Sequence, residues 1–227
     1  MSSEPRLVEV RRNILKENDI LARALRRRFH QAGVRVISLV SSPGSGKTAL
    51  LERLLTDLGA VHRVAALVGD LATDNDAARL ARSGTPVKQI TTGTVCHLDA
   101  GMVERALQGW NLEQFDFLFI ENVGNLVCPS SFDLGEDLRL VLTSTTEGED
   151  KPLKYPTIFN TADVAVITKL DLTSAAGCDL EALRGNIQRV RPGMMVFAVS
   201  AKSGEGVEQL RSFLVSRPLS RSALHRS

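Results

Sequence analysis

The stretch Ser-Ser-Pro-Gly-Ser-Gly-Lys-Thr, residues 41–48, has the residue types and spacing of a phosphate-binding loop. It follows an apolar, strand-like run and precedes a leucine-rich pattern with helical spacing, which is the context that such a loop needs. Its glycines permit a tight turn with N–H groups aimed at phosphate oxygens, and the following helix adds partial positive charge. The expected phosphate-binding residues are Pro43, Gly44, Ser45, Gly46, Lys47, Thr48 and Ala49.

Two residues of this loop are expected to carry the chemistry. Lys47 can reach the β- and γ-phosphates, and the Thr48 hydroxyl can bind Mg²⁺. The strict pattern begins with Gly or Ala, whereas this chain has Ser41, which we interpret as a tolerated small residue. The alternative is a glycine-rich turn with a chance Lys-Thr pair, and the flanking strand and helix disfavour it.

Acidic residues stand at the ends of two further strand-like runs. Asp70 ends one run shortly before Asp74 and Asp76, and Glu121 ends another shortly before Gly124. Carboxylates at strand ends suit Mg²⁺ and an attacking water, and the Gly124 N–H is expected to touch the γ-phosphate. Helix capping is an equal alternative for Asp74 and Asp76, and the sequence does not decide which acid binds Mg²⁺ and which activates water. The candidate catalytic residues are Lys47, Asp70, Asp76 and Glu121, and the candidate Mg²⁺ ligands are Thr48, Asp70 and Glu121.

Two short motifs indicate a guanine nucleotide. Thr-Lys-Leu-Asp at 168–171 and Ser-Ala-Lys at 200–202 resemble the base-reading pair of GTPases, in which Asn usually stands where this chain has Thr168. A carboxylate at Asp171 can accept hydrogen bonds from N1–H and the 2-amino group of guanine, which adenine cannot offer together. Lys-Leu-Asp alone also fits an ordinary strand end, but the order of the three motifs favours GTP over ATP. The candidate base-binding residues are Lys169, Asp171, Ser200, Ala201 and Lys202.

Cys96, His97 and Cys128 also follow strand-like runs, so their side chains can converge at one edge of a sheet. Thiolate and imidazole are ligands that Zn²⁺ and Ni²⁺ accept. Three ligands leave a coordination position open or require donors from a second chain. Spacing alone leaves buried structural cysteines as the alternative. Cys178 has no His or Cys neighbour, and we interpret it as structural.

The elements that position these residues alternate along the chain. Short Val- and Ile-rich runs are nearly continuous, as in strands buried on both faces of a parallel sheet, and helical patterns separate them. This order predicts an α/β fold with a doubly wound, mostly parallel sheet of the P-loop NTPase type. Ligands of such sheets bind beyond the carboxyl ends of the strands. The expected divisions are an N-terminal helical segment at 1–33, a GTPase domain with the metal site at 34–217, and a flexible tail at 218–227.

Composition narrows the class of protein. The 227 residues are 43% hydrophobic, enough for one sizeable core. A net charge of +2 gives no reason to expect a nucleic-acid partner, and the basic clusters near the N-terminus predict a solvated helix face, with docking to an acidic partner as the alternative. No apolar stretch is long enough to span a bilayer, and the N-terminus has no signal-peptide core, so we expect a cytoplasmic protein.

The longer motifs resemble one family. The chain is similar to the HypB family, the nickel-incorporation GTPases of hydrogenase maturation, from about Val36 to Val215. The segments that carry the resemblance are SSPGSGKT, DLATDNDAARL, TTGTVCHLDA, ENVGNLVCPSSFDLGE, TEGEDKPLKYP and TKLDL. That family belongs to dimerising GTPases related to the signal recognition particle and Min proteins. The resemblance implies slow hydrolysis of GTP to GDP, a metal site of Cys96, His97 and Cys128 near a dimer interface, and Ni²⁺ or Zn²⁺ as the ion.

The same resemblance implies partners. They are a second copy of the chain in a GTP-dependent homodimer, a hydrogenase nickel-insertion accessory protein and the precursor of the hydrogenase large subunit. The chain has no His-rich stretch and no N-terminal cysteine motif, so we do not expect nickel storage. The alternatives are a GTPase chaperone for a urease or a cobalamin enzyme, a non-hydrolysing metal-binding module, and a small-molecule kinase.

Overall fold

A seven-stranded parallel sheet lies at the centre of the computed structural model, which describes residues 4–70 and 75–216. The strand order is β3-β2-β4-β1-β5-β6-β7. This confirms the predicted fold class; Asp74 and the predicted tail lie outside the described residues. The strands are β1 (Arg35–Ser41), β2 (Val64–Asp70), β3 (Val87–Thr91), β4 (Phe117–Glu121), β5 (Leu138–Ser144), β6 (Val164–Thr168) and β7 (Met195–Ala198).

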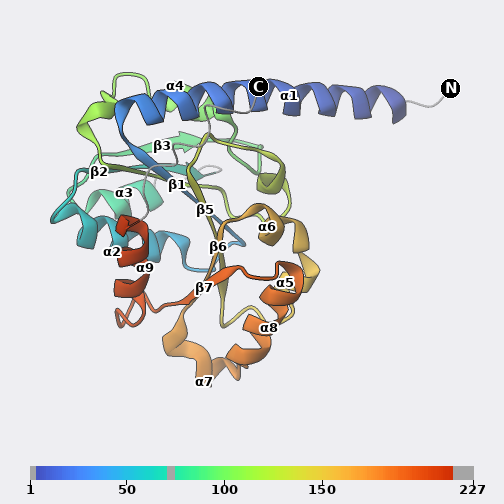
Figure 1. Ribbon diagram of the computed structural model, residues 1–227, viewed down its shortest axis with the longest axis vertical. Coiled ribbons are helices and arrows are strands. Elements are labelled where there is room, and N and C mark those ends of the chain that lie inside the picture. The colour runs from blue at the N-terminus through green and yellow to red at the C-terminus, as the bar shows by residue number, and fades with distance from the viewer. Residues whose placement is uncertain (1–3, 71–74, 217–227) are drawn as a thin grey trace.

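Helices cover both faces of the sheet (Figure 1). One hydrophobic cluster joins one face to α2 and α9, and two others join the opposite face to α1, α4, α6 and α8. The α-helices are α1 (Glu4–Ala32), α2 (Lys47–Gly59), α3 (Asn75–Ala81), α4 (Ala100–Ala106), α5 (Lys151–Lys154), α6 (Pro156–Thr161), α7 (Thr173–Ala176), α8 (Leu180–Val190) and α9 (Val207–Ser216). Three 3₁₀ turns are η1 (Leu112–Gln114), η2 (Cys128–Ser131) and η3 (Leu170–Leu172). Among the described residues, every helix is too short or too polar to cross a membrane.

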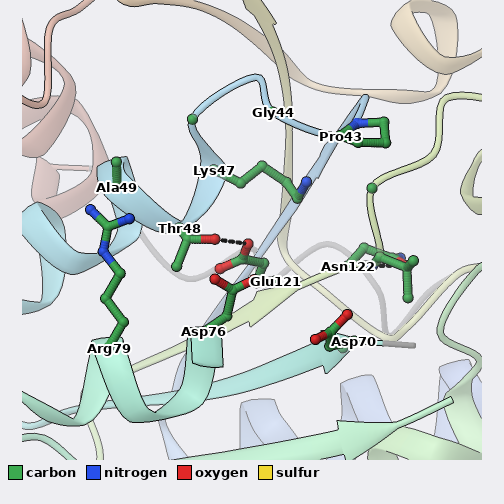
Figure 2. Close-up of a pocket in the computed structure, with 14 residues that line it drawn as sticks. Pro43, Gly44, Lys47, Thr48, Ala49, Asp70, Asp76, Arg79, Glu121 and Asn122 are labelled. Atoms are coloured by element: carbon green, nitrogen blue, oxygen red, sulfur yellow. Dashed lines mark hydrogen bonds between the residues drawn. The ribbon is translucent and has the colours of Figure 1, made fainter. Parts of the chain in front are cut away.

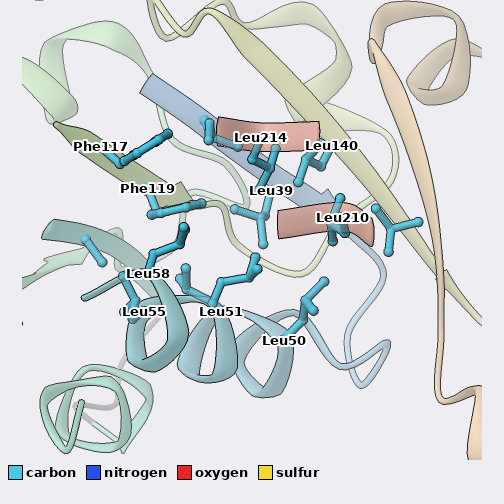
Figure 3. Packing of buried hydrophobic residues seen from close by; sticks show 14 of the residues in the cluster. Leu39, Leu50, Leu51, Leu55, Leu58, Phe117, Phe119, Leu140, Leu210 and Leu214 are labelled. Carbon is cyan, nitrogen blue, oxygen red and sulfur yellow. The ribbon is translucent and has the colours of Figure 1, made fainter. Parts of the chain in front are cut away.

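Helix α2 holds the phosphate-binding loop against the sheet. Its leucines recur at intervals of three and four residues, so they share one face, and that face packs on β1, β4, β5 and α9 (Figure 3). Burial of each leucine contributes about 1.5–3 kcal/mol. The fully buried side chains are Leu50, Leu51, Leu54, Leu55 and Leu58. The helix is therefore anchored, and its N-terminus stays at the carboxyl edge of the sheet.

Helix α1 extends past the elements that it covers. Its N-terminal turns reach beyond the other elements in Figure 1. Its second half packs on the sheet through Ala22, Leu25 and Phe29, all of them buried. Arg27 and Arg28 are exposed, as a solvated face predicts, whereas Arg26 pairs with Asp133 at 2.6 Å. The division of the chain at residue 33 stays a prediction.

A buried ion pair fixes the loop before β5. The Arg139 guanidinium lies 2.6 Å from the Glu136 carboxylate, which also accepts a hydrogen bond from Ser38 at 3.0 Å. Both charged side chains are less than 10% exposed. Arg139 also donates to the carbonyl oxygens of Phe132 at 2.7 Å and Pro129 at 3.4 Å. One buried cation thereby holds the turn that contains Cys128.

We predict that Arg139→Leu strongly destabilises the protein. The substitution leaves the Glu136 carboxylate buried without its cation and frees two carbonyl groups, which costs about 3–5 kcal/mol. Urea denaturation measures the loss. Arg63→Gln is the matched control, because Arg63 pairs with Asp116 at 2.6 Å on the surface and its side chain is 62% exposed. Equal losses in the two variants would contradict the prediction.

Candidate functional site

A cavity of about 470 Å³ opens at the carboxyl ends of β1, β2 and β4 (Figure 2). It brings together ten residues that the sequence predicts: Pro43, Gly44, Gly46, Lys47, Thr48, Ala49, Asp70, Asp76, Glu121 and Gly124. Ser45 is fully buried behind the loop. Asn122 and Arg79 also line the cavity, although the sequence analysis did not select them. The region of the predicted phosphate and Mg²⁺ site is thus a real concavity, whereas the individual roles stay predictions.

The backbone of the loop needs its glycines. Gly44 and Gly46 have φ values of 73° and 94°, where side chains other than glycine are strained. Gly46 precedes the 13-residue α2 without a side-chain cap, so the first N–H groups of the helix face the cavity. A Cβ on Gly124 would stand 2.9 Å from the Cα of Pro43. The segment after β4 therefore lies directly against the phosphate-binding loop.

Ser41 and Lys47 explain why serine is accepted at the start of the motif. The Lys47 ammonium donates to Ser41 Oγ at 2.9 Å, and Ser41 donates to the Ser42 carbonyl at 2.7 Å. Burial lowers the pKa of Lys47, and the carboxylate of Glu121 acts in the opposite direction. A buried cation with an incomplete set of partners is suited to receive a phosphate.

Glu121 is the buried carboxylate at the centre of the acidic group. Its Oε1 accepts a hydrogen bond from Thr48 at 2.7 Å, and its buried Oε2 has no partner among the described residues. Burial raises its pKa to about 7, partly opposed by the charge of Lys47. Asp70 and Asp76 lie on the same wall of the cavity (Figure 2). An orphaned carboxylate oxygen beside a threonine hydroxyl fits a divalent cation.

We predict that Glu121→Gln stabilises the nucleotide-free protein above pH 7 while it abolishes Mg²⁺-dependent GTP hydrolysis. The pKa of Glu121 rises from 4.5 to about 7 on folding, so its charged form destabilises the fold increasingly as pH rises through that window. At pH 8 the melting temperature is expected to rise by at least about 2 °C.

The same variant supplies its own control at low pH. At pH 4 the carboxyl group is mostly protonated in both the folded and the unfolded chain, so the melting temperature is expected to change little. A lower melting temperature at pH 8 would contradict the prediction.

The predicted base-binding residues lie on two neighbouring turns, after β6 and after β7. Ser200 donates to Asp171 at 2.6 Å and so joins the two turns. Lys169 has φ 56°, and its carbonyl accepts from Thr145 at 2.8 Å. Thr168 Oγ1 donates to the Ser45 carbonyl at 2.5 Å. The threonine therefore links the base-binding turn to the phosphate-binding loop.

Cys96, His97 and Cys128 converge, as the sequence predicts. Their ligand atoms lie within 4.8 Å of one another, and the two sulfur atoms are 2.9 Å apart. The three residues are half-buried. His97 stacks on Phe132 at 3.9 Å, and its buried Nδ1 has no hydrogen-bond partner in the described part of the chain. Burial lowers the pKa of His97, which favours the neutral imidazole that a metal ion needs.

Two loops carry these ligands, and asparagine side chains join them. The Cys96 loop (residues 92–99) lies between β3 and α4, and the Cys128 loop (residues 122–137) lies between β4 and β5. Asn122, only 2% exposed, accepts hydrogen bonds from the N–H groups of Leu98 at 3.0 Å and Val123 at 2.9 Å. Asn125 donates to the Cys96 carbonyl at 3.3 Å. Asn122 therefore touches the nucleotide cavity and the Cys96 loop at once.

Fold and site together define a P-loop nucleotide-binding protein with a Cys/His cluster fit for a metal ion. A family model described as CobW/HypB/UreG, nucleotide-binding domain, matches residues 35–198. The chain belongs to this family and, within it, to the hydrogenase maturation factors HypB.

The relatives support that assignment over most of their length. Hydrogenase maturation factor HypB of Azotobacter chroococcum is 49% identical over 207 residues, covering 90% of this chain and 67% of that protein. The HypB of Escherichia coli strain K12 is 45% identical over 212 residues, covering 93% and 73%.

Two solved structures share the fold. HypB of Archaeoglobus fulgidus has a TM-score of 0.82 at 38% identity, covering 88% of this chain and 98% of that one. HypB of Helicobacter pylori in complex with nickel has a TM-score of 0.83 at 42% identity, covering 88% and 94%.

Proposed function

We propose that this chain is a cytoplasmic GTPase that carries nickel and assists its insertion into a hydrogenase precursor. The observation that carries the proposal is the convergence of Cys96, His97 and Cys128 beside a nucleotide cavity, with Asn122 in contact with both. Membership of the HypB family supports the same activity. Hydrolysis of GTP to GDP and phosphate would then time the release of nickel.

Different residues of the cavity are suited to different steps of GTP binding and hydrolysis. The N–H groups before and within the first turn of α2, with the Lys47 ammonium, bind and orient the phosphates of GTP. Thr48, Glu121 and Asp70 would hold Mg²⁺, which when bound supplies positive charge against the charge that develops on the phosphate oxygens. Water attacks the γ-phosphorus while its bond to the β-bridging oxygen breaks. Asp76 lies beside Glu121 and is a candidate for orienting this water.

Asp171 is proposed to select guanine. Ser200 already orients its carboxylate at 2.6 Å, and Lys169, Ala201 and Lys202 lie on the same two turns. The carboxylate would accept hydrogen bonds from N1–H and the 2-amino group of the base. Adenine does not present both donors at this edge, so charge-assisted hydrogen bonds to Asp171 would favour guanine over adenine.

We predict that Asp171→Asn lowers GTP affinity by roughly 100-fold, because two charge-assisted hydrogen bonds are lost or reversed. Xanthosine triphosphate, which has a carbonyl where guanine has its amino group, is expected to bind the variant better than GTP does. Nucleotide titration by calorimetry measures both affinities.

The matched control for this prediction is Asp179→Asn. Asp179 caps α8 on the surface, where its carboxylate accepts from the Ala182 N–H at 3.0 Å. This variant is expected to bind GTP like the parent protein. Unchanged selectivity in Asp171→Asn would contradict the assigned role.

The metal ion is the cargo of the proposed chaperone rather than its resident cofactor. Three donors leave at least one coordination position for a second copy of the chain or for the receiving protein. Nickel is the expected cargo, since the related Helicobacter pylori protein is described in complex with nickel, and Zn²⁺ suits the same donors. The proposed partners are a second copy of this chain, the nickel-insertion accessory protein and the hydrogenase large-subunit precursor.

We predict that the nucleotide state changes metal affinity through Asn122. The γ-phosphate would shift the segment after β4, and Asn122 would pass that shift to Leu98, next to His97. Ni²⁺ and Zn²⁺ titrations with GDP and with a non-hydrolysable GTP analogue are expected to give different affinities in the parent protein. Asn122→Leu is expected to remove the difference, and Cys128→Ala to weaken binding in both states.

Asn111→Ala is the control for this prediction. Asn111 also accepts a hydrogen bond from a backbone N–H, that of Glu113 at 3.2 Å, but on an exposed turn away from both ligand loops. It is expected to keep the nucleotide-dependent difference. Equal metal affinity with GDP and the GTP analogue in the parent protein would show that the two sites are uncoupled.

A further inference from the structure

Asn18, near the middle of α1, is a buried side chain that joins the two ligand loops. Only 5% of it is exposed. Its Oδ1 accepts a hydrogen bond from the Ala100 N–H at 2.9 Å, and its Nδ2 donates to the Asp133 carbonyl at 2.9 Å. Because both partners are main-chain groups, one a donor and one an acceptor, the orientation of the amide is unambiguous.

One partner directly follows the Cys96 loop, and the other lies within the Cys128 loop. Ala100 is the first residue of α4 and follows the Cys96 loop directly, and the Asp99 side chain caps the same helix end by accepting from the Met102 N–H at 2.7 Å. Asp133 follows Phe132, the residue that stacks on His97. A single amide thus fixes both the loop that carries Cys96 and His97 and the loop that carries Cys128.

Other contacts seat the Cys128 loop on α1. Arg26 pairs with the Asp133 carboxylate at 2.6 Å, and His30 lies 2.6 Å from the Asp137 carboxylate. Gly135 has φ 81°, and a Cβ there would stand 2.8 Å from the Ala22 carbonyl oxygen. The loop therefore approaches the backbone of α1 closely, and its position depends on that of the helix.

We infer that Asn18 is a positioning residue for metal binding, which makes α1 a structural part of the metal site. The inference rests on the proposed function, in which Cys96, His97 and Cys128 are the ligands. Asn18 sets the spacing between the two loops at residues that follow their metal ligands, and Asn122 holds the Cys96 loop from the nucleotide side. A displacement of α1 reaches both cysteine loops through one buried hydrogen-bonded group.

The test is a Ni²⁺ titration of Asn18→Leu in the full chain, followed by absorption in the thiolate-to-metal charge-transfer region. Leucine has the same branching and the same number of side-chain heavy atoms but makes neither hydrogen bond. Loss of an outer partner of a metal site costs roughly 10–100-fold in affinity, and we expect a loss in that range together with a changed charge-transfer spectrum. Asn18→Asp keeps an acceptor for Ala100 but sets an oxygen against the Asp133 carbonyl, so the same spectral change is expected with a smaller loss of affinity.

Phe29→Leu is the matched control. Phe29 is fully buried on the same helix and packs in the apolar cluster beneath it. The variant is expected to lower the melting temperature without changing the Ni²⁺ spectrum or affinity. A loss of nickel affinity equal to that of Asn18→Leu would overturn the inference, because the effect would then reflect general stability.

The remaining outcomes separate this inference from the proposed function. If both Asn18 variants bind Ni²⁺ like the parent while Cys96→Ala and Cys128→Ala do not, the positioning role is wrong and the proposed site stands. If the cysteine variants bind Ni²⁺ unchanged, the proposed site itself is wrong. If Asn18→Leu does not fold, the spectrum and affinity of Asn18→Asp decide the question.

Discussion

Buried main-chain groups at the carboxyl edge of the sheet need hydrogen-bond partners, and the loops there are too irregular to supply them to one another. Asparagine side chains supply these partners in and next to the two loops that carry Cys96, His97 and Cys128. Asn122 holds the Leu98 N–H, Asn18 holds the Ala100 N–H and the Asp133 carbonyl, and Asn125 holds the Cys96 carbonyl. These hydrogen bonds hold the chain on both sides of His97 and next to Phe132, which stacks on its ring.

The nucleotide cavity adds a second constraint, which is the burial of charge without complete neutralisation. Lys47 and Glu121 are both less than 10% exposed. Burial lowers the pKa of Lys47 and raises that of Glu121, so it favours the neutral form of each side chain. A nucleotide with its cation would supply the opposite charges that these groups lack. Uncharged side chains at these two positions would therefore make the fold more stable, and this conflict between stability and function is usual at such sites.

Much of this arrangement can be predicted from the sequence because it depends on local patterns. The strand, glycine loop and helix around Lys47 follow from hydrophobic periodicity and turn chemistry, and the two cysteine segments each follow a recognisable strand. In strand β5, Arg139 stands among apolar residues and is buried, although an arginine in a sequence usually marks an exposed position. The arginine is tolerated there because Glu136 and two carbonyl oxygens surround it. No property of the isolated segment reveals those partners.

The asparagines were missed for the same reason. In the sequence, Asn18 resembles a polar residue on an exposed helix face, and only the packing of α1 shows that it is buried between two loops. The signal that could have drawn attention to Asn122 and Asn125 is their place directly after β4, in the segment that carries Cys128. Pairings between residues distant in sequence are set by the tertiary fold and leave no periodicity to read.

The two ligand loops are held in a way that suits a metal ion that is later passed to another protein. Asn18 and Arg139 fix the loops at the residues that follow the ligands, and the ligands themselves stay half-buried. The three ligands are themselves partly exposed, and Val127, next to Cys128, is 62% exposed, so solvent reaches the region of the cluster. A closed structural site surrounds its ion with four protein ligands, whereas this cluster offers three from the part of the chain that the structure describes. Rigid support behind the ligands and an accessible side in front of them allow a receiving protein to approach the ion without unfolding the site.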